Sequence, residues 1–238
     1  MNTKAIILDK DGVLLDFNAF WLPVSIEASR KILAQLGYES ISLEEVLSAI
    51  GVENGTRSIQ GALSGGTYGD IAEKMRQVMT THGIAVSPEA LTKHTVEAYH
   101  SCIGEGVILP HCDDIVSVLE DLKSRGLVIA LVTSDDTTMT RHSLRTLGIE
   151  AYFDIVYADD GTHPNKPDPY CINDLIEKLG IEKSQIVMVG DSISDMIFAK
   201  NGGIRGIGVA ETASNRDILL TYTDTVIPDI SHLWKVLY

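Results

Sequence analysis

Several short apolar runs in the sequence end in side chains that can hold a metal ion or phosphate, or attack phosphorus. They are carboxylates, hydroxyls and one lysine, namely Asp9, Asp11, Thr133, Ser134, Lys166, Asp191 and Asp195. Carboxylate oxygens are ligands that Mg²⁺ prefers. An ammonium, a hydroxyl or a backbone N–H can hold phosphate oxygens. A carboxylate near so much positive charge can attack phosphorus, so the set indicates phosphoryl chemistry through an aspartyl phosphate.

The apolar runs themselves are typical of strands in a parallel sheet that is buried on both faces. They span residues 5–8, 127–132, 155–157, 186–189 and 207–209, with a weaker run at 225–227. Helical patterns that end at Gly126 and Gly180 lie between them. The alternation predicts an α/β doubly wound parallel-sheet core. Ligands bind such sheets at the carboxyl ends of the strands, so we expect these side chains to gather at one edge.

Residues 16–103 have a different pattern, because four helical stretches occur there with no strand between them. The stretches cover 23–36, 43–50, 71–81 and 88–99, and residues 51–69 form a loop rich in Gly, Ser and Thr. Ser87 followed by Pro88 is a favourable start for the last helix. We therefore expect a smaller all-helical domain over residues 16–103, inserted into a catalytic core made of residues 1–15 and 104–238.

Composition excludes some classes of function. The 238-residue chain has a formal net charge of -14, which disfavours binding to nucleic acid. Apolar runs stay well below the ~18 residues that span a bilayer, and no signal peptide is evident. Three cysteines, an odd number, match no zinc motif; they are Cys102, Cys112 and Cys171. These features predict a cytoplasmic protein that binds neither nucleic acid nor membrane. We also expect a monomer or small homo-oligomer with a small phosphorylated metabolite as its partner.

The order of the chemical residues resembles the haloacid dehalogenase superfamily, which has four motifs along the chain. Asp9, Asp11 and Gly12 match the first motif. The resemblance implies that Asp9 is the nucleophile. It also implies that Asp11 protonates the leaving alcohol and later activates water, while its main-chain carbonyl binds the metal. Thr133 matches the second motif and would hold the phosphate together with backbone N–H groups near Ser134.

The third and fourth motifs complete the resemblance. Lys166 precedes a helical pattern, as the third motif requires, and would hold the phosphate. Gly190, Asp191, Ser192 and Asp195 match the fourth motif, in which Asp195 supports the site or binds the metal. The helical insert is similar to the C1-type cap of the family. The metal implied is Mg²⁺, and its implied ligands are Asp9, Asp11 and Asp191.

The resemblance implies a Mg²⁺-dependent phosphatase for a small phosphomonoester, and the first motif with Leu109-Pro110 is similar to phosphoglycolate phosphatases. A β-phosphoglucomutase-like sugar phosphomutase is an alternative, although residues 14–21 lack the histidine that those enzymes place after the nucleophile. A non-catalytic phosphate-binding or partner-binding protein is another. Asp135 and Asp136 could disfavour highly anionic substrates or face solvent, and Phe20 and Trp21 could line the substrate entrance or fill the core of the insert.

Overall fold

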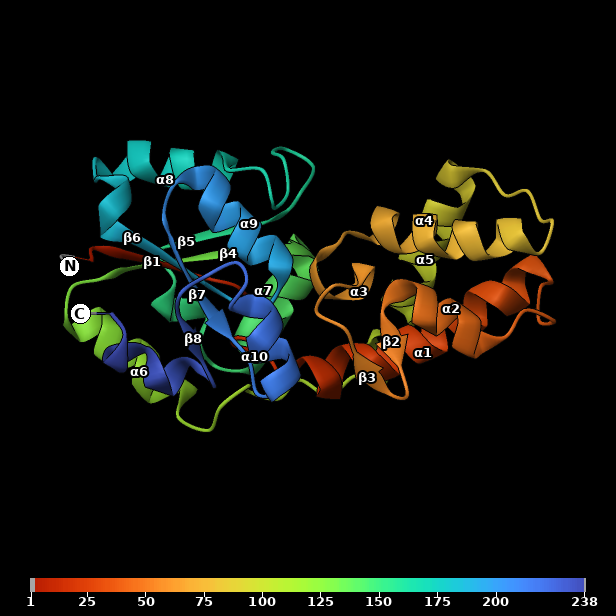
Figure 1. Cartoon of the computed structure of the whole chain (residues 1–238), viewed down its shortest axis with the longest axis horizontal. Helices are drawn as coiled ribbons and strands as arrows, with labels where there is room; N and C mark the ends of the chain where they lie inside the picture. Colours follow the sequence, from red (N-terminus) through yellow and green to blue (C-terminus); the bar gives the residue numbers. More distant parts are fainter. Residues whose placement is uncertain (1–2, 238) are drawn as a thin grey trace. The chain divides into compact units, whose positions relative to one another are not determined.

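A computed structural model describes residues 3–237 and divides them into two compact units (Figure 1). Residues 3–16 and 108–237 form the first, here called the core unit. Phe17–Val107 forms the second, here called the insert unit. Among the described residues, no helix combines the length and the apolar character needed to cross a membrane.

The core unit contains a six-stranded sheet in the order β5-β4-β1-β6-β7-β8, and every pairing is parallel. The strands are β1 (Ala5–Leu8), β4 (Val128–Asp136), β5 (Ile155–Asp159), β6 (Ile186–Gly190), β7 (Arg205–Val209) and β8 (Val226–Ile227). Ile7 of the central strand β1 is opposite Ala130 on one side and Met188 on the other. The predicted α/β parallel-sheet fold is confirmed.

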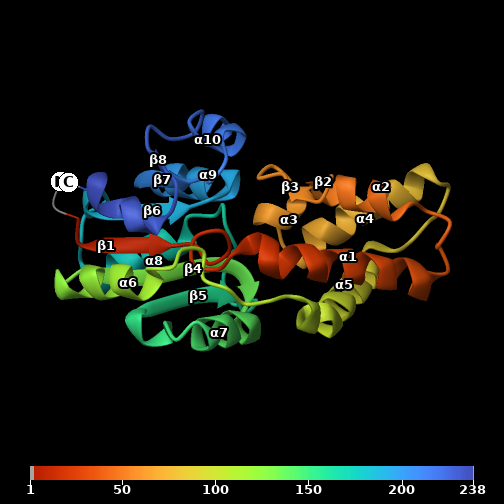
Figure 2. The same ribbon diagram turned by 90° about the horizontal axis from the view of Figure 1, so that it is seen from below.

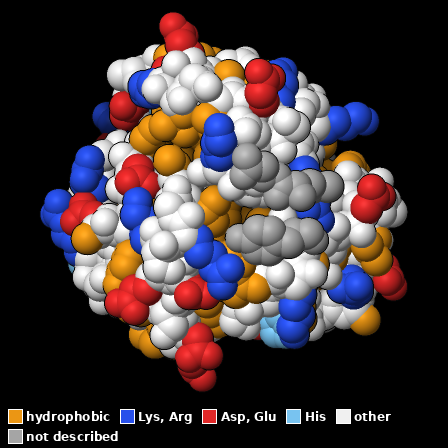
Figure 3. Space-filling model, turned by 90° about the vertical axis from the view of Figure 1, so that its left-hand side faces the viewer, with side chains coloured by type: hydrophobic (Ala, Val, Ile, Leu, Met, Phe, Trp, Pro, Cys, Tyr) orange, Lys and Arg blue, Asp and Glu red, His pale blue; other side chains and the backbone are white. Residues whose placement is uncertain are grey.

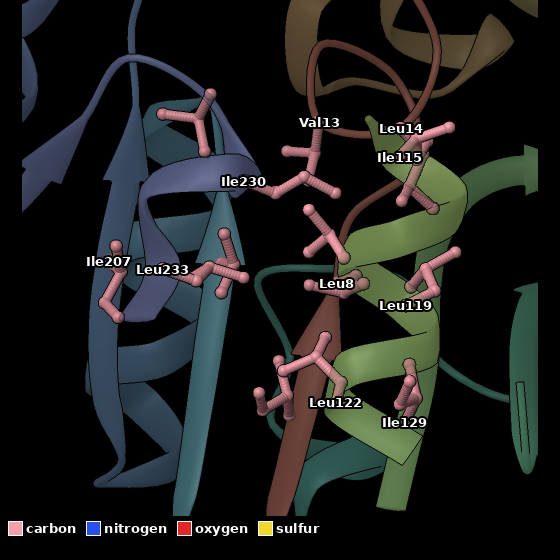
Figure 4. Packing of buried hydrophobic residues seen from close by; sticks show 14 of the residues in the cluster. Leu8, Val13, Leu14, Ile115, Leu119, Leu122, Ile129, Ile207, Ile230 and Leu233 are labelled. Atoms are coloured by element: carbon pink, nitrogen blue, oxygen red, sulfur yellow. The ribbon is translucent and has the colours of Figure 1, made fainter. Parts of the chain in front are cut away.

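Helices cover both faces of this sheet, and Figure 1 shows α6 and α8 on opposite sides of the strands. The helices are α6 (Ile115–Ser124), α7 (Thr137–Thr146), α8 (Tyr170–Leu179), α9 (Ile193–Gly202) and α10 (Ala213–Leu219). Leu8 packs with Leu119 of α6 and with Leu233 near the C-terminus (Figure 4). Ile7 packs on the other face with Leu175 of α8. Because side chains alternate along a strand, β1 anchors both hydrophobic layers.

The insert unit is mostly helical, and its longest helix, α1, lies beside α5 (Figure 2). Its helices are α1 (Phe17–Leu36), α2 (Leu43–Ile50), α3 (Ala62–Gly65), α4 (Tyr68–Thr81) and α5 (Pro88–Cys102). The predicted cap of α5 is present, since Ser87 Oγ accepts a hydrogen bond from Ala90 N–H. Phe20 and Trp21 are buried and pack edge to face, which places both in the interior of this unit.

Helix α1 begins six residues before the predicted start at Pro23, which lies inside it. Proline has no N–H, so the carbonyl four residues earlier, that of Ala19, loses its helical partner. That carbonyl instead accepts a hydrogen bond from Val107 N–H at 3.0 Å. In the core unit, Asp16 N–H similarly donates to Leu109 O at 2.9 Å. The helical hydrogen bond that Pro23 cannot donate to Ala19 O is thus replaced by one from Val107, a residue distant in sequence.

The prediction that residues 16–103 contain no strand is wrong. A short antiparallel hairpin pairs β2 (Val52–Glu53) with β3 (Thr56–Arg57). Asn54 and Gly55 form its turn with φ angles of 50° and 73°. An Asn-Gly pair favours such hairpin turns because both residues tolerate positive φ.

Acidic and basic side chains are interspersed on one face of the core unit (Figure 3). Hydrophobic side chains lie between them in small groups. The net charge of -14 is therefore not expressed as one continuous acidic surface on this face.

Candidate active site

The sheet order brings the ends of the predicted motifs together. Asp9 directly follows β1, and Asp191 directly follows its neighbour β6. On the other side of β1, Thr133 lies in β4, two residues beyond Leu131, the partner of Leu8. All three lie toward the carboxyl ends of adjacent parallel strands, which is where α/β sheets bind ligands.

Lys166 joins two of the predicted aspartates. Its Nζ lies 2.6 Å from Asp9 Oδ1 and 2.6 Å from Asp195 Oδ1. The Lys166 side chain is only 4 % exposed, and those of Asp9 and Asp195 are 8 % and 0 % exposed. Charge-assisted hydrogen bonds in such a dry site are strong and fix the geometry of all three groups.

Asp195 is held from two directions. One carboxylate oxygen accepts from Lys166, while Oδ2 accepts from Ser192 N–H at 3.0 Å and from Ser192 Oγ–H at 2.7 Å. Ser192 Oγ in turn accepts from Asp195 N–H, so the pair forms a capping box at the start of α9. A Cβ added at Gly190 would lie 2.3 Å from Asp195 Cβ. These contacts explain why the motif has glycine, serine and aspartate at this spacing.

The loop that carries Lys166 is anchored at both ends. Asn201 of α9 donates to Pro167 O at 2.9 Å. His163 stacks on Tyr170, with ring centroids 5.6 Å apart and an interplanar angle of 11°. Neither Asn201 nor His163 was expected from sequence to serve the site, because both act only by supporting a neighbouring segment.

Asp9, Asp191 and Asp195 form a buried carboxylate group in which one ligand oxygen of each lies within 4.8 Å of the others. Three carboxylates this close repel one another unless cations join them. A hard divalent cation fits the group, because its ligands are oxygens and because it would remove the repulsion. The Asp11 carboxylate lies outside the group and is bonded instead to Lys10.

The electrostatics agree with that fit. Burial raises the pKa of Asp9 well above its ordinary value, and the neighbouring aspartates add to the effect while Lys166 opposes it. Burial tends to lower the pKa of Lys166, but Asp195 and Asp9 raise it above the usual range, so Lys166 stays an ammonium. A bound cation would favour the ionised form of Asp9 in the same way that Lys166 does.

Thr133 and Ser134 lie on the β4 side. Thr133 is 4 % exposed, and its Oγ accepts from Asp135 N–H at 3.2 Å. Ser134 is half-buried. Asp136, the last residue of β4, caps the start of α7, where its Oδ1 accepts a hydrogen bond from Met139 N–H at 3.0 Å. The second motif therefore lies where a strand turns directly into a helix.

Lys10 is a buried charge that sequence reasoning missed. Its side chain is 0 % exposed, and its Nζ lies 2.9 Å from Asp11 Oδ1 and 2.8 Å from Asp135 Oδ2. Asp135 therefore pairs with Lys10, and the expectation that it could face solvent is wrong. Burial raises the pKa of Asp135 to about 6 against the attraction of Lys10, so above that pH its carboxylate form predominates. The available signal for a buried ion pair was Lys10 itself, which stands between two aspartates, together with the acidic Asp135 after the second motif.

Comparison with known proteins agrees with this geometry. Residues 3–203 match the model of the haloacid dehalogenase-like hydrolases. The chain is 30 % identical to the phosphoglycolate phosphatase of Vibrio parahaemolyticus, over 98 % of this chain and 95 % of that protein. It is 34 % identical to the pyrophosphatase PpaX of Bacillus velezensis, over 52 % of this chain and 58 % of that protein.

A solved structure extends the likeness of the fold to the whole chain. The crystal structure of a predicted phosphoglycolate phosphatase from Haemophilus somnus matches it with a TM-score of 0.73. The match covers 100 % of this chain and 99 % of that chain at 20 % identity. Because the family model matches most of the chain, the chain belongs to the haloacid dehalogenase-like hydrolases and is a phosphoric monoester hydrolase.

Proposed function

We propose that the protein hydrolyses a small phosphomonoester, with phosphoglycolate as the first candidate, through a phosphorylated Asp9. The observation that carries this proposal is the buried set of Asp9, Lys166 and Asp195, joined by two 2.6 Å contacts. In this proposal the core unit performs the chemistry, and the insert unit corresponds to the cap of the family.

In the first step, a carboxylate oxygen of Asp9 attacks phosphorus while the bond from phosphorus to the ester oxygen breaks. Lys166 and the Thr133 hydroxyl, together with backbone N–H groups near Ser134, hold the phosphate oxygens and oppose their growing charge. Asp11 gives its proton to the departing oxygen, so that an alcohol leaves instead of an alkoxide.

In the second step, Asp11 takes a proton from water, and the water oxygen attacks the phosphorus of the aspartyl phosphate. The bond between Asp9 and phosphorus breaks, which releases inorganic phosphate and restores the carboxylate. Asp11 is protonated again and is ready for the next ester. The same carboxyl therefore serves as acid and then as base.

The metal that we assign to the site is Mg²⁺. Asp9, Asp191 and the main-chain carbonyl of Asp11 would hold it, and Asp195 would support them. When bound, the metal supplies positive charge to the phosphate and favours the ionised form of Asp9. The fit rests on the buried carboxylate group described above and on the preference of Mg²⁺ for oxygen ligands.

The substrate assignment rests on the extent of the likeness. The phosphoglycolate phosphatase of V. parahaemolyticus aligns over nearly its whole length, whereas the pyrophosphatase aligns over about half. A short carboxylated phosphomonoester is therefore the first substrate to test. Pyrophosphate and sugar phosphates follow, since a phosphomutase would use the same nucleophile without net release of phosphate.

The test is phosphate release from phosphoglycolate, pyrophosphate, sugar phosphates and p-nitrophenyl phosphate, each with Mg²⁺ and with a chelator. Asp9→Asn removes the nucleophile and is expected to lower kcat by at least about 10³-fold while the fold persists. Asp217→Asn, at an exposed aspartate of α10, is the matched control and should behave as the wild type.

Near wild-type turnover by Asp9→Asn would contradict the mechanism. Interconversion of sugar phosphates without phosphate release would favour the phosphomutase. Binding of phosphate with no turnover of any ester would favour a non-catalytic phosphate-binding protein.

A further inference from the structure

The buried ammonium of Lys10 has no part in the steps above, yet it contacts a residue that does. We propose that Lys10, held by Asp135, is a positioning residue that fixes the Asp11 carboxyl for proton transfer. This inference rests on the proposed function, because it assigns a role within the same reaction. Its basis is the pair of contacts of 2.9 Å to Asp11 Oδ1 and 2.8 Å to Asp135 Oδ2.

A lysine side chain that is 0 % exposed differs from the usual surface lysine, because burying an ammonium is unfavourable unless carboxylates compensate it. The two contacts place a carboxylate of Asp11 and a carboxylate of Asp135 against the Lys10 ammonium, so that negative charge compensates the buried positive charge. One ammonium here joins the loop after β1 to the end of β4.

The backbone around Lys10 is fixed as well. Its carbonyl accepts hydrogen bonds from Leu14 N–H and Leu15 N–H, both at 2.9 Å. On the other strand, Asp135 N–H is bonded to Thr133 Oγ. Asp11 keeps 16 % of its side chain exposed, so it is both anchored and accessible. The ion pair from Lys10 to one oxygen of Asp11 restricts rotation of the Asp11 carboxyl. Proton transfer requires a carboxyl that is held at hydrogen-bond distance and in the right orientation.

Two kinds of ester separate this role from a merely structural one. An alkyl ester such as phosphoglycolate needs a proton on its leaving oxygen, whereas p-nitrophenolate is stable enough to leave without one. The later hydrolysis of the aspartyl phosphate is common to both esters and affects kcat. The value of kcat/KM reports the steps through loss of the alcohol, so the ratio of kcat/KM values isolates the acid role of Asp11.

Three variants test the contact. Lys10→Met removes the ammonium, so that the carboxylates of Asp11 and Asp135 lose their positive partner. Lys10→Met combined with Asp135→Leu replaces the buried pair by apolar groups, an exchange that proteins often tolerate. Asp135→Asn removes only the charge that holds Lys10. Lys74→Met, at an exposed lysine of α4, is the matched control.

We expect kcat/KM for phosphoglycolate to fall about 10- to 100-fold more than kcat/KM for p-nitrophenyl phosphate in Lys10→Met and in the double variant. Asp135→Asn should give the same selective loss in smaller measure, and Lys74→Met should give none. Circular dichroism and thermal melting show which variants are folded. If Lys10→Met does not fold, the double variant and Asp135→Asn decide the test.

Equal losses for both esters, or no loss for either, would overturn the positioning role while leaving the phosphatase assignment intact. Absence of Asp9-dependent turnover in the wild type would instead overturn the proposed function, and this inference with it. The two failures are thus distinguished by the wild-type and Asp9→Asn measurements.

Discussion

Asp195 illustrates how much one residue in this site depends on the absence of a neighbouring side chain. Its two oxygens bond to Lys166 and to Ser192, and this arrangement leaves no room for a Cβ at Gly190. The glycine therefore serves the site by allowing the end of β6 to approach Asp195. Any side chain at that position would compete with the carboxylate that holds Lys166.

Gly190→Ala is accordingly expected to displace Asp195 and, through it, Lys166. Overpacking of this kind costs about 1–3 kcal/mol of stability. Displacement of Lys166, the proposed phosphate-binding group, should lower kcat/KM by about 10- to 100-fold. Gly104→Ala is the control, because a Cβ there would meet nothing within 4 Å. Wild-type kcat/KM in Gly190→Ala, measured on the preferred ester, would rule out this steric argument.

At the same scale, the sequence identifies residues by type and order but not by their contacts. Asp9 and Lys166 could be predicted because each occupies a motif position. The charges of Lys10 and Asp135 are visible in the sequence next to two motifs, but their spacing of 125 positions does not show that the two side chains meet inside the protein. Asn201 supports Pro167 through a backbone carbonyl, and that role requires no particular sequence pattern.

Helices and strands with a strong hydrophobic pattern could be predicted from the sequence. An element whose bounds depend on hydrogen bonds to residues far away in the sequence could not. β1 has the expected bounds because its residues form one apolar run, and α8 ends where expected because Gly180 closes it. The start of α1 was missed because a proline inside a helix is tolerated only when its orphaned carbonyl finds a partner, here Val107. The hairpin at Asn54-Gly55 was missed although its turn signal was present.

Asp154, directly before β5, is bonded to α6 and to β4, and these bonds give a prediction about pH. Burial raises its pKa, but hydrogen bonds from Lys123 Nζ of α6 and from Ile129 N–H of β4 outweigh burial and hold the pKa below its usual range. A lowered pKa in the folded state stabilises the fold above the unfolded pKa of about 3.9, and this stability is lost as the pH falls through the folded pKa.

Asp154→Asn should therefore cost about 1 kcal/mol at pH 7, since the carboxylate is partly exposed. The difference from the wild type should shrink toward zero as the pH falls through the folded pKa of Asp154, which lies below its usual range. Urea unfolding at pH 7 and at a series of lower pH values measures it, with the exposed Asp217→Asn as reference. A difference that grows as the pH falls would contradict the sign of the pKa shift.

For the molecule as a whole, the proposed Mg²⁺ site predicts a link between metal binding and stability. A cation that binds only the folded protein stabilises it by ~2.7 kcal/mol at a concentration of 100 Kd. For a chain of this size that corresponds to a rise in Tm of roughly 5–10 °C. Melting with saturating Mg²⁺ and with a chelator measures the rise.

Asp191→Asn, which removes one proposed ligand, should abolish most of that rise while leaving the Tm in chelator unchanged or higher, since it relieves repulsion among the buried carboxylates. The same rise in the variant and the wild type would place the stabilising metal elsewhere. Titration of Mg²⁺ by calorimetry provides a second readout that needs no substrate.

Two backbone hydrogen bonds lie where the chain passes between the core unit and the insert unit, and they bear on how the protein can evolve. Asp16 is tied to Leu109 within the core unit, and Ala19 is tied to Val107 within the insert unit. The outgoing and returning segments of the chain are therefore joined by a backbone hydrogen bond in each unit. Segments joined in this way can be lengthened, replaced or lost at little cost to the host fold. We therefore expect the insert unit to vary in length and sequence independently of the core unit.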